Sequence, residues 1–149
     1  MAIAYASVGF EVTLLTAIGQ YLESKGIGKW TGPYGALDTP IAIDALASTP
    51  DRGIALTLYP VADTGGTGST VGLQVRFRGP AGNRSAVKNI ADNTFDALHG
   101  LEHITWGGIP IIRVWRQSGV YIGTDANNRS ESTANYYIEL IRSGTNRSD

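Results

Sequence analysis

The side chains best suited to acid–base chemistry lie in one predicted helix over residues 83–99. Asp92 and Asp96 are one helical turn apart and share a face, which is the proximity that a general acid and a general base require. That face lies partly opposite the apolar residues of the same helix, so we expect both carboxylates to be solvated. The sequence contains neither a Gly-x-Ser-x-Gly motif nor a convincing Ser/His/Asp set. We therefore predict that the protein is not an enzyme.

The two histidines of the chain, His99 and His103, have the four-residue spacing of a metal-binding pair on a helix. Gly100 lies between them and is expected to end the helix. Only Asp96 and Glu102 are close enough in sequence to supply a third ligand. The simpler interpretation is a surface or capping histidine at a helix C-terminus. Because the chain has no cysteine, disulfides and thiolate metal sites are excluded, and we predict no metal and no cofactor.

The glycine-rich stretch 65–68 is the third candidate for chemistry, because such loops can hold phosphate. It has no following Lys-Ser/Thr pair, and it runs into a predicted strand instead of a helix. It therefore offers no helix N-terminus to an anion. We interpret this stretch as the tip of a hairpin.

Charge and hydropathy narrow the class of partner. The chain has 149 residues and a formal net charge of -1, with 12 basic and 13 acidic residues mixed along its length. This argues against sequence-independent binding of nucleic acid and against a polybasic membrane patch, since both need a concentrated basic surface. The N-terminus has no signal-peptide pattern, and no apolar run is long enough to span a membrane. The length fits one domain over residues 1–149.

A strand followed by a helix forms the centre of the predicted fold. Apolar residues alternate over 71–78, which indicates a strand with one buried face. Over 83–99 they recur every three or four residues, which indicates an amphipathic helix. Asn83 or Ser85 can cap the first amides of this helix, and Gly100 suits its end. A strand that is covered by the following helix predicts an α+β domain.

Further elements complete an α+β fold with a mainly antiparallel, curved sheet and two helices packed on one face. The remaining predicted elements are a helix at 10–25 and strands at 41–45, 54–59, 101–106, 109–115 and 134–141. Long loops are expected at 29–40, 60–70 and 116–133, and a flexible tail at 142–149.

Two sets of side chains have both a structural and a functional interpretation. Trp30 and Tyr34 lie on a loop rich in glycine and proline, where they either cover the core or contact a partner. We favour the cover for Trp30. Arg76 and Arg78 lie on the polar face of the central strand, where they either form cross-strand ion pairs in solvent or belong to a face used in subunit packing. The residues alone leave this second choice open.

Several segments, taken together, resemble one family. Residues 50–60, PDRGIALTLYP, and residues 71–79, VGLQVRFRG, resemble consecutive motifs of the minor capsid and tail terminator proteins of siphophages that infect actinobacteria. Residues 91–100 resemble the helix end AD-x-x-FD-x-LHG of that family. Residues 116–137 resemble its closing pattern RxSG, xGxD, R, NYY. The matches keep their order along most of the chain.

The resemblance implies a virion protein at the head–tail junction, with a tail-terminator-like fold and no catalytic activity, assembled in the host cytoplasm. Such proteins typically form a ring, expected here to be a hexamer, on the last ring of the tail tube. Its implied partners are itself, the major tail tube protein and the head–tail connector or stopper protein, while genomic DNA passes through the lumen without specific binding. No membrane contact is implied.

Other readings of the sequence remain. Within the virion, the alternative is a head-completion (stopper) protein or a minor capsid protein of the neck. From other classes, the alternatives are a small α+β enzyme that would use Asp92, Asp96 and His99, and a monomeric binding module.

The loops at 29–40, 60–70 and 116–133 are expected to reach neighbouring subunits or the tail tube. Near-zero net charge suits a channel wall that DNA must pass, because a strongly cationic lining would retain it. The candidate assembly residues are Trp30, Tyr34, Thr67, Arg76, Arg78, Tyr121, Asp125 and Arg129.

Overall fold

The computed structural model describes residues 8–149, and its central pair of elements is the predicted one. In strand β3 (Gly68–Ala81), the alternating apolar side chains Val71, Leu73, Val75 and Phe77 are buried. Helix α2 (Arg84–Leu98) begins after Asn83, whose side chain accepts a hydrogen bond from the Ala86 amide at 3.1 Å. Of the two predicted caps, Asn83 is therefore the one used.

Six strands form one sheet in the order β1-β2-β3-β6-β5-β4. Neighbouring strands pair antiparallel, except for β1 and β2, which pair parallel. Beside β3 and α2, the elements are α1 (Phe10–Ser24), β1 (Ile41–Ile43), β2 (Gly53–Asp63), β4 (Glu102–Trp106), β5 (Ile109–Thr124) and β6 (Arg129–Ile141).

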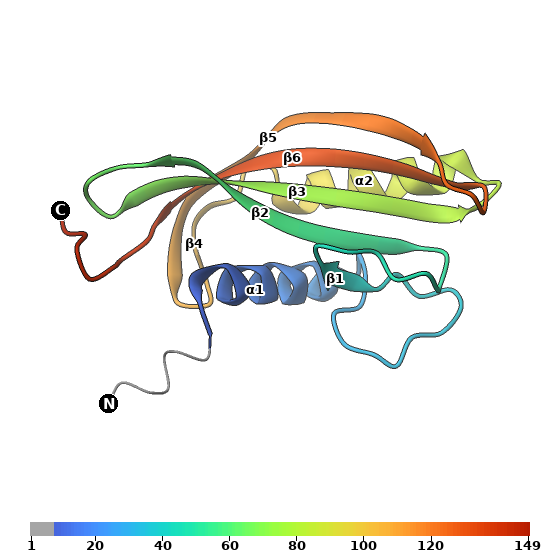
Figure 1. Cartoon of the computed structure of the whole chain (residues 1–149), viewed down its shortest axis with the longest axis horizontal. Coiled ribbons are helices and arrows are strands. Elements are labelled where there is room, and N and C mark those ends of the chain that lie inside the picture. Colours follow the sequence, from blue (N-terminus) through green and yellow to red (C-terminus); the bar gives the residue numbers. More distant parts are fainter. Residues whose placement is uncertain (1–7) are drawn as a thin grey trace.

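Both helices pack on the same face of the curved sheet, with α1 under β2 and α2 along β3, β6 and β5 (Figure 1). They contact one core, and the hydroxyl of Tyr21 on α1 donates a hydrogen bond of 2.7 Å to the Ala97 carbonyl of α2. Because α1 also touches β1 and β4, the two edges of the sheet, the sheet curls around it. The predicted fold class is confirmed, and no helix of residues 8–149 lies on the opposite, convex face.

The prediction of a long loop at 116–133 is wrong. Strand β5 continues to Thr124 and β6 begins at Arg129, so only residues 125–128 form the turn. The sequence misled because this half of β5 is exposed on both faces and contains Gly119 and Gly123, so it lacks an apolar alternation. Two bulges, between Arg116 and Ser118 and between Tyr121 and Gly123, shift the pattern further.

One other expectation needs correction. The loop predicted at 60–70 is short, because β2 runs to Asp63 and β3 begins at Gly68. A bulge between Pro60 and Ala62 lies within β2. The predicted short edge strand is present as β1, and it pairs parallel with β2 across a link at residues 44–52 that contains no helix.

The C-terminal segment, expected to be a flexible tail at 142–149, makes specific contacts with the β2–β3 hairpin. The guanidinium of Arg147 donates hydrogen bonds to the carbonyls of Thr64, Gly66 and Gly68. The Asp149 carboxylate accepts from the backbone amide of Thr67 at 2.8 Å and from its hydroxyl. The segment thus supplies hydrogen-bond partners to a turn that has few of its own.

Candidate assembly surfaces

The residues considered for catalysis and metal binding do not form an acid–base pair in a pocket or a set of metal ligands within residues 8–149. Asp92 and Asp96 are exposed on α2. His99 ends this helix, stacks on Phe95 with ring centroids 4.6 Å apart, and accepts a 2.9 Å hydrogen bond at Nδ1 from the amide of Arg116 on β5. It therefore fixes α2 against the sheet, as a capping histidine does. Across residues 8–149, no three His, Asp or Glu side chains gather closely enough to hold a metal ion.

Arg78 is buried inside the subunit, with 4% of its surface exposed. Its guanidinium donates hydrogen bonds to the carbonyls of Asp51 at 2.6 Å, Pro50 at 2.9 Å and Ala47. Burial lowers the pKa of Arg78 from its ordinary value, and the nearby Arg129 acts in the same direction. Arg78 thus fastens the segment 44–52, which links β1 to β2, onto the convex face of the sheet.

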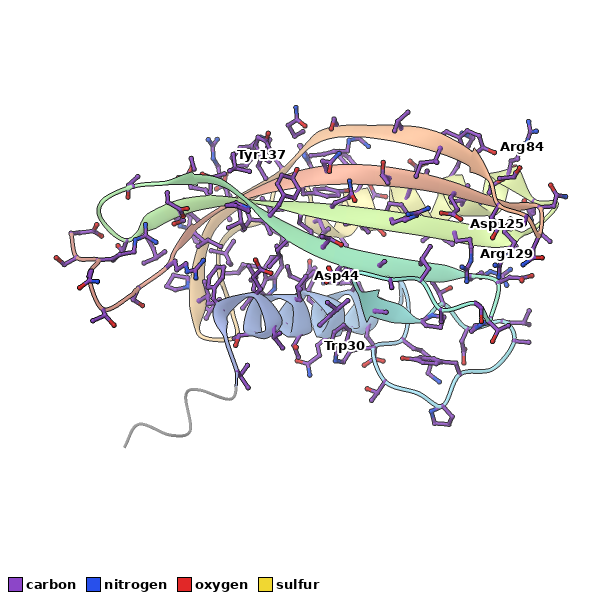
Figure 2. All side chains as sticks on the ribbon, viewed as in Figure 1. Trp30, Asp44, Arg84, Asp125, Arg129 and Tyr137 are labelled. Carbon is purple, nitrogen blue, oxygen red and sulfur yellow. The ribbon has the colours of Figure 1, made fainter. Side chains whose placement is uncertain are left out.

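Asp125 and Arg129 close the β5–β6 turn, and Figure 2 shows them together at that end of the sheet. The Asp125 carboxylate accepts hydrogen bonds from the amides of Arg129 and Asn127 and from Nε of Arg129 at 2.8 Å. The pKa of Asp125 is lowered, first by the Arg129 amide and then by the Arg129 side chain. Arg129 is buried, and its Nη1 also donates to the Ser48 carbonyl at 2.7 Å. Together with Arg78, this cluster stabilises the turn and the 44–52 segment.

The loop that carries Trp30 and Tyr34 is held firmly to the body. Trp30 is half-buried and packs on α1, where a Cβ at Gly19 would lie 2.1 Å from its ring. The Tyr34 hydroxyl donates to the Trp30 carbonyl at 3.1 Å, and the Asp38 carboxylate accepts from the Gly35 amide at 2.7 Å. Trp30 therefore covers the core, as favoured from the sequence, whereas Tyr34 is exposed.

The convex face carries a row of aromatic side chains that sequence reasoning missed. Tyr59, Gly72, Tyr137 and Trp115 are in register across β2, β3, β6 and β5. The Tyr59 ring lies over Gly72, where a Cβ would be 2.1 Å from it, and the Trp115 and Tyr137 rings meet edge to face at 5.8 Å. The Arg113 guanidinium lies 4.3 Å from the Trp115 ring centroid. Only the strand register brings these residues together, and the sequence alone did not supply it.

On the same face, Arg76 is exposed and pairs with Glu131 on β6, with Nε donating at 2.7 Å. This is the cross-strand ion pair that was one of the two interpretations of the polar strand face. The other interpretation, subunit packing, stays a prediction, because an exposed arginine such as Arg76 is compatible with the rim of an interface.

The far half of β5 borders a groove against α2. The groove encloses ≈ 650 Å³ between Lys88 and Asp92 of α2 and the β5 residues from Arg116 to Tyr121. The Lys88 ammonium lies 5.3 Å from the Tyr121 ring centroid. The hydroxyl of Ser132, in the groove lining, is buried and has no hydrogen-bond partner within residues 8–149. On β6, the strand that also carries Ser132, burial raises the pKa of Tyr136 to about 12, so this phenol stays neutral.

The comparisons with known proteins place this fold. A family model described as "Bacteriophage tail terminator protein" matches residues 21–141. The chain belongs to the bacteriophage tail terminator family. No curated protein matches the sequence. The family membership confirms the resemblance found in the sequence and makes the chain a structural component of a phage virion.

Solved structures share the fold of this terminator-family chain at low identity. One belongs to the virion of a native gene transfer agent particle, with a TM-score of 0.54 and 14% identity, covering 67% of this chain and 78% of the other. A second solved protein gives a TM-score of 0.56 and 12% identity, and covers 90% of this chain and 94% of its own. At this identity, the likeness is one of fold.

The eight candidate assembly residues do not form one site in the terminator fold. Arg78, Asp125 and Arg129 meet inside the subunit at one end of the sheet. Trp30 and Tyr34 share a loop beside α1, and Arg76 lies on the convex face. Tyr121 borders the groove, while Thr67 lies at the hairpin tip under Asp149. Their roles in assembly remain predictions, and the exposed members are the ones available to a neighbour. No helix within residues 8–149 has the length and apolar character needed to cross a membrane.

Proposed function

We propose that this chain forms a closed ring, a hexamer, on the last ring of the tail tube, where it ends polymerisation of the tube and joins it to the head connector. The observation that carries the proposal is the match to the tail terminator family over residues 21–141, in a chain with the α+β fold expected of it. The partners are further copies of the chain, the major tail tube protein and the connector or stopper protein. The protein acts by shape, with no cofactor and no catalytic step.

A ring subunit needs two different surfaces that fit each other, because head-to-tail contacts close only when a patch on one copy meets another patch on the next. The subunit offers distinct exposed surfaces on opposite sides of the sheet. The convex face carries the aromatic row and Arg76, and the far half of β5 carries Tyr121 beside the groove. Two distinct surfaces of this kind are compatible with the head-to-tail contacts of a cyclic ring.

Genomic DNA passes through the ring in this proposal without specific binding. The formal net charge of -1 supports this, because a channel wall with many cations would retain the duplex by counterion release. A reconstruction of the virion neck with the chain traced in it tests the point. A circle of Lys or Arg side chains at the narrowest part of the lumen would contradict it.

The function is tested by removing the gene from the phage that carries it. A terminator mutant is expected to make abnormally long tails without heads, because nothing stops the tube from growing, and electron microscopy measures the tail lengths. Complementation with the wild-type gene is the control. Tails of normal length beside heads that lose their DNA would overturn the terminator role and favour the stopper alternative. In parallel, native mass spectrometry of the purified chain is expected to show a hexamer.

A further inference from the structure

Two exposed apolar clusters lie on the subunit, and no other element of the described chain covers them. On the loop at residues 29–40, Leu37 is 81% exposed and Tyr34 is 39% exposed. On the far half of β5, Val120 and Ile122 are 63% and 50% exposed. Leu37 and Val120 are the two most exposed large hydrophobic side chains that the structure describes. Large apolar side chains that gather at the surface are typical of a protein–protein contact.

The edge of β5 that carries the second cluster is open to another molecule. The amide of Arg116 donates to His99, and beyond Arg116 no strand of residues 8–149 pairs with the outer side of β5. Residues 117–124 contain no charged side chain and no proline. The groove of ≈ 650 Å³ between β5 and α2 borders the same stretch. This edge therefore lacks the charges and prolines that keep neighbouring chains away from an open strand.

The loop that carries Leu37 is fixed to the subunit by polar contacts. The Lys29 ammonium lies 3.4 Å from the Asp38 carboxylate and donates a hydrogen bond of 3.1 Å to the Pro33 carbonyl. The same carboxylate accepts from the Gly35 amide at 2.7 Å, which closes the turn that contains Leu37. A side chain that is held in place before binding loses little conformational entropy in a complex.

The two clusters lie on opposite edges of the sheet and toward the same end of the molecule. The loop leads into β1, the first strand in the sheet order, whereas the far half of β5 extends beyond its pairing with β4 on the other side. Figure 1 shows the loop and the far half of β5 toward the same end of the longest axis. A second copy placed beside the first, without a shift along this axis, therefore brings its loop to the β5 edge.

The charges beside the two clusters are opposite in sign. Residues 30–50 contain two acids and no base, and one of the acids, Asp44, is exposed and forms no ion pair within the described chain. Residues 84–91, at the start of α2, contain two bases and no acid, and one of the bases, Lys88, borders the groove. The Asp92 carboxylate in the groove offsets part of this charge. Opposite charges on the two sides steer two copies toward this orientation.

We propose that the loop carrying Leu37 packs against the β5 edge of a second copy of the chain. Leu37 is the central side chain on one side of the contact, and Val120 and Ile122 are those on the other. Because the loop and the β5 edge are different surfaces, the contact is head-to-tail, and its repetition leads around a ring. This inference rests on the proposed ring and names the surfaces that join its subunits.

Opposite charges introduced on the two sides test the contact through assembly. Leu37→Lys or Val120→Glu alone is expected to abolish the ring in native mass spectrometry, because each places an unpaired charge in an apolar contact. Mixing the two variants is expected to restore a ring of alternating subunits, since each new lysine then meets a new glutamate and every other contact is native. Both side chains are exposed, so the circular dichroism and the urea midpoint of the subunit are expected to be unchanged.

The matched control is Val12→Lys, at a position 49% exposed near the start of α1, which Figure 1 shows toward the opposite end of the longest axis. This variant is expected to keep the ring. A ring that survives either single substitution, a ring that mixing does not restore, or a ring lost in the control overturns the contact but leaves the proposed function standing. A wild-type chain that is monomeric at every concentration overturns the proposed ring itself.

Paired cysteines test the proximity of the two clusters in a protein that has no cysteine of its own. Leu37→Cys combined with Val120→Cys is expected to give covalent dimers and higher multimers under mild oxidation, read on a denaturing gel. Leu37→Cys combined with Val12→Cys is the control. Cross-linking in the first pair alone supports the inference. Equal cross-linking in the control, or none in the first pair, overturns it.

Discussion

Arg76 and Arg78 extend from the same face of β3, yet burial gives them different roles. Arg76 is exposed and pairs with the largely buried Glu131, while Arg78 is covered by residues 44–52 and donates to three of their carbonyls. The sequence identified both as residues of a polar strand face. It could not distinguish them, because the segment that covers Arg78 belongs to another part of the chain and its path is fixed only by the parallel β1–β2 pair.

The first prediction concerns this pair of arginines. Arg78→Ala leaves three carbonyls without their donor and is expected to lower the free energy of unfolding by about 3 kcal/mol. Arg76→Ala removes a half-exposed guanidinium from the largely buried Glu131 carboxylate, and because water can take the place of the removed group it is expected to cost less, about 1 kcal/mol. Urea denaturation of both variants measures the difference. Equal losses would show that Arg78 contributes no more than a surface side chain.

The second prediction concerns how the free energy of unfolding falls at low pH. The pKa of Asp125 in the folded protein is below the ordinary value of 3.8, so its ionised form stabilises the fold. This stabilisation is present above the ordinary pKa and is lost as the pH falls through the lowered, folded-state value. Asp125→Asn is therefore expected to destabilise the protein at neutral pH and to reduce the loss of stability on acidification. Urea midpoints measured between neutral pH and pH values below the ordinary pKa test this, and parallel profiles for wild type and variant would refute it.

At the scale of elements, local signals were enough for the helices and for the centre of the sheet. The cap at Asn83, the alternation in β3 and the strands on either side of residues 107–108 depend on neighbouring residues, so the sequence predicts them. The extension of β5 was missed because its residues are satisfied by pairing with β6 and not by burial. The aromatic row was missed for a related reason, since strand register is a long-range property.

The third prediction tests the start of α2. Asn83→Ala removes the side-chain acceptor for the Ala86 amide and is expected to lower the free energy of unfolding by about 1 kcal/mol. Ser85→Ala lies inside the first turn of the helix and is the control, with little expected change. Thermal unfolding followed by circular dichroism compares the two. A larger loss of stability in Ser85→Ala would contradict the assignment of the cap to Asn83.

The fourth prediction tests the contact between α1 and the loop after it. A Cβ at Gly19 would lie 2.1 Å from the Trp30 ring, so Gly19→Ala must displace the indole and is expected to cost about 1–3 kcal/mol. In a Trp30→Ala background the same change has no ring to displace and is expected to cost much less. Equilibrium unfolding of the four proteins in this double-mutant cycle measures the coupling. Additive effects would show that the ring does not press on the helix.

At the scale of the whole molecule, the open edge of β5 bears on how the proposed ring responds to salt. Residues 117–124 on this edge contain no charged side chain, so salt has few charges to screen at a contact formed there. The fifth prediction is that the hexamer persists from low salt to about 1 M NaCl, since apolar burial and backbone pairing are not weakened by ionic strength. Analytical ultracentrifugation over this range tests it. Dissociation at high salt would indicate that ion pairs such as Arg76–Glu131 hold the subunits together instead.

The contacts of Arg147 and Asp149 with the β2–β3 hairpin have a practical consequence for producing the protein. An affinity tag fused after Asp149 would place foreign chain beside Thr67 and compete for the carbonyls that Arg147 binds. A tag fused after Asp149 should therefore be cleaved before assembly is measured.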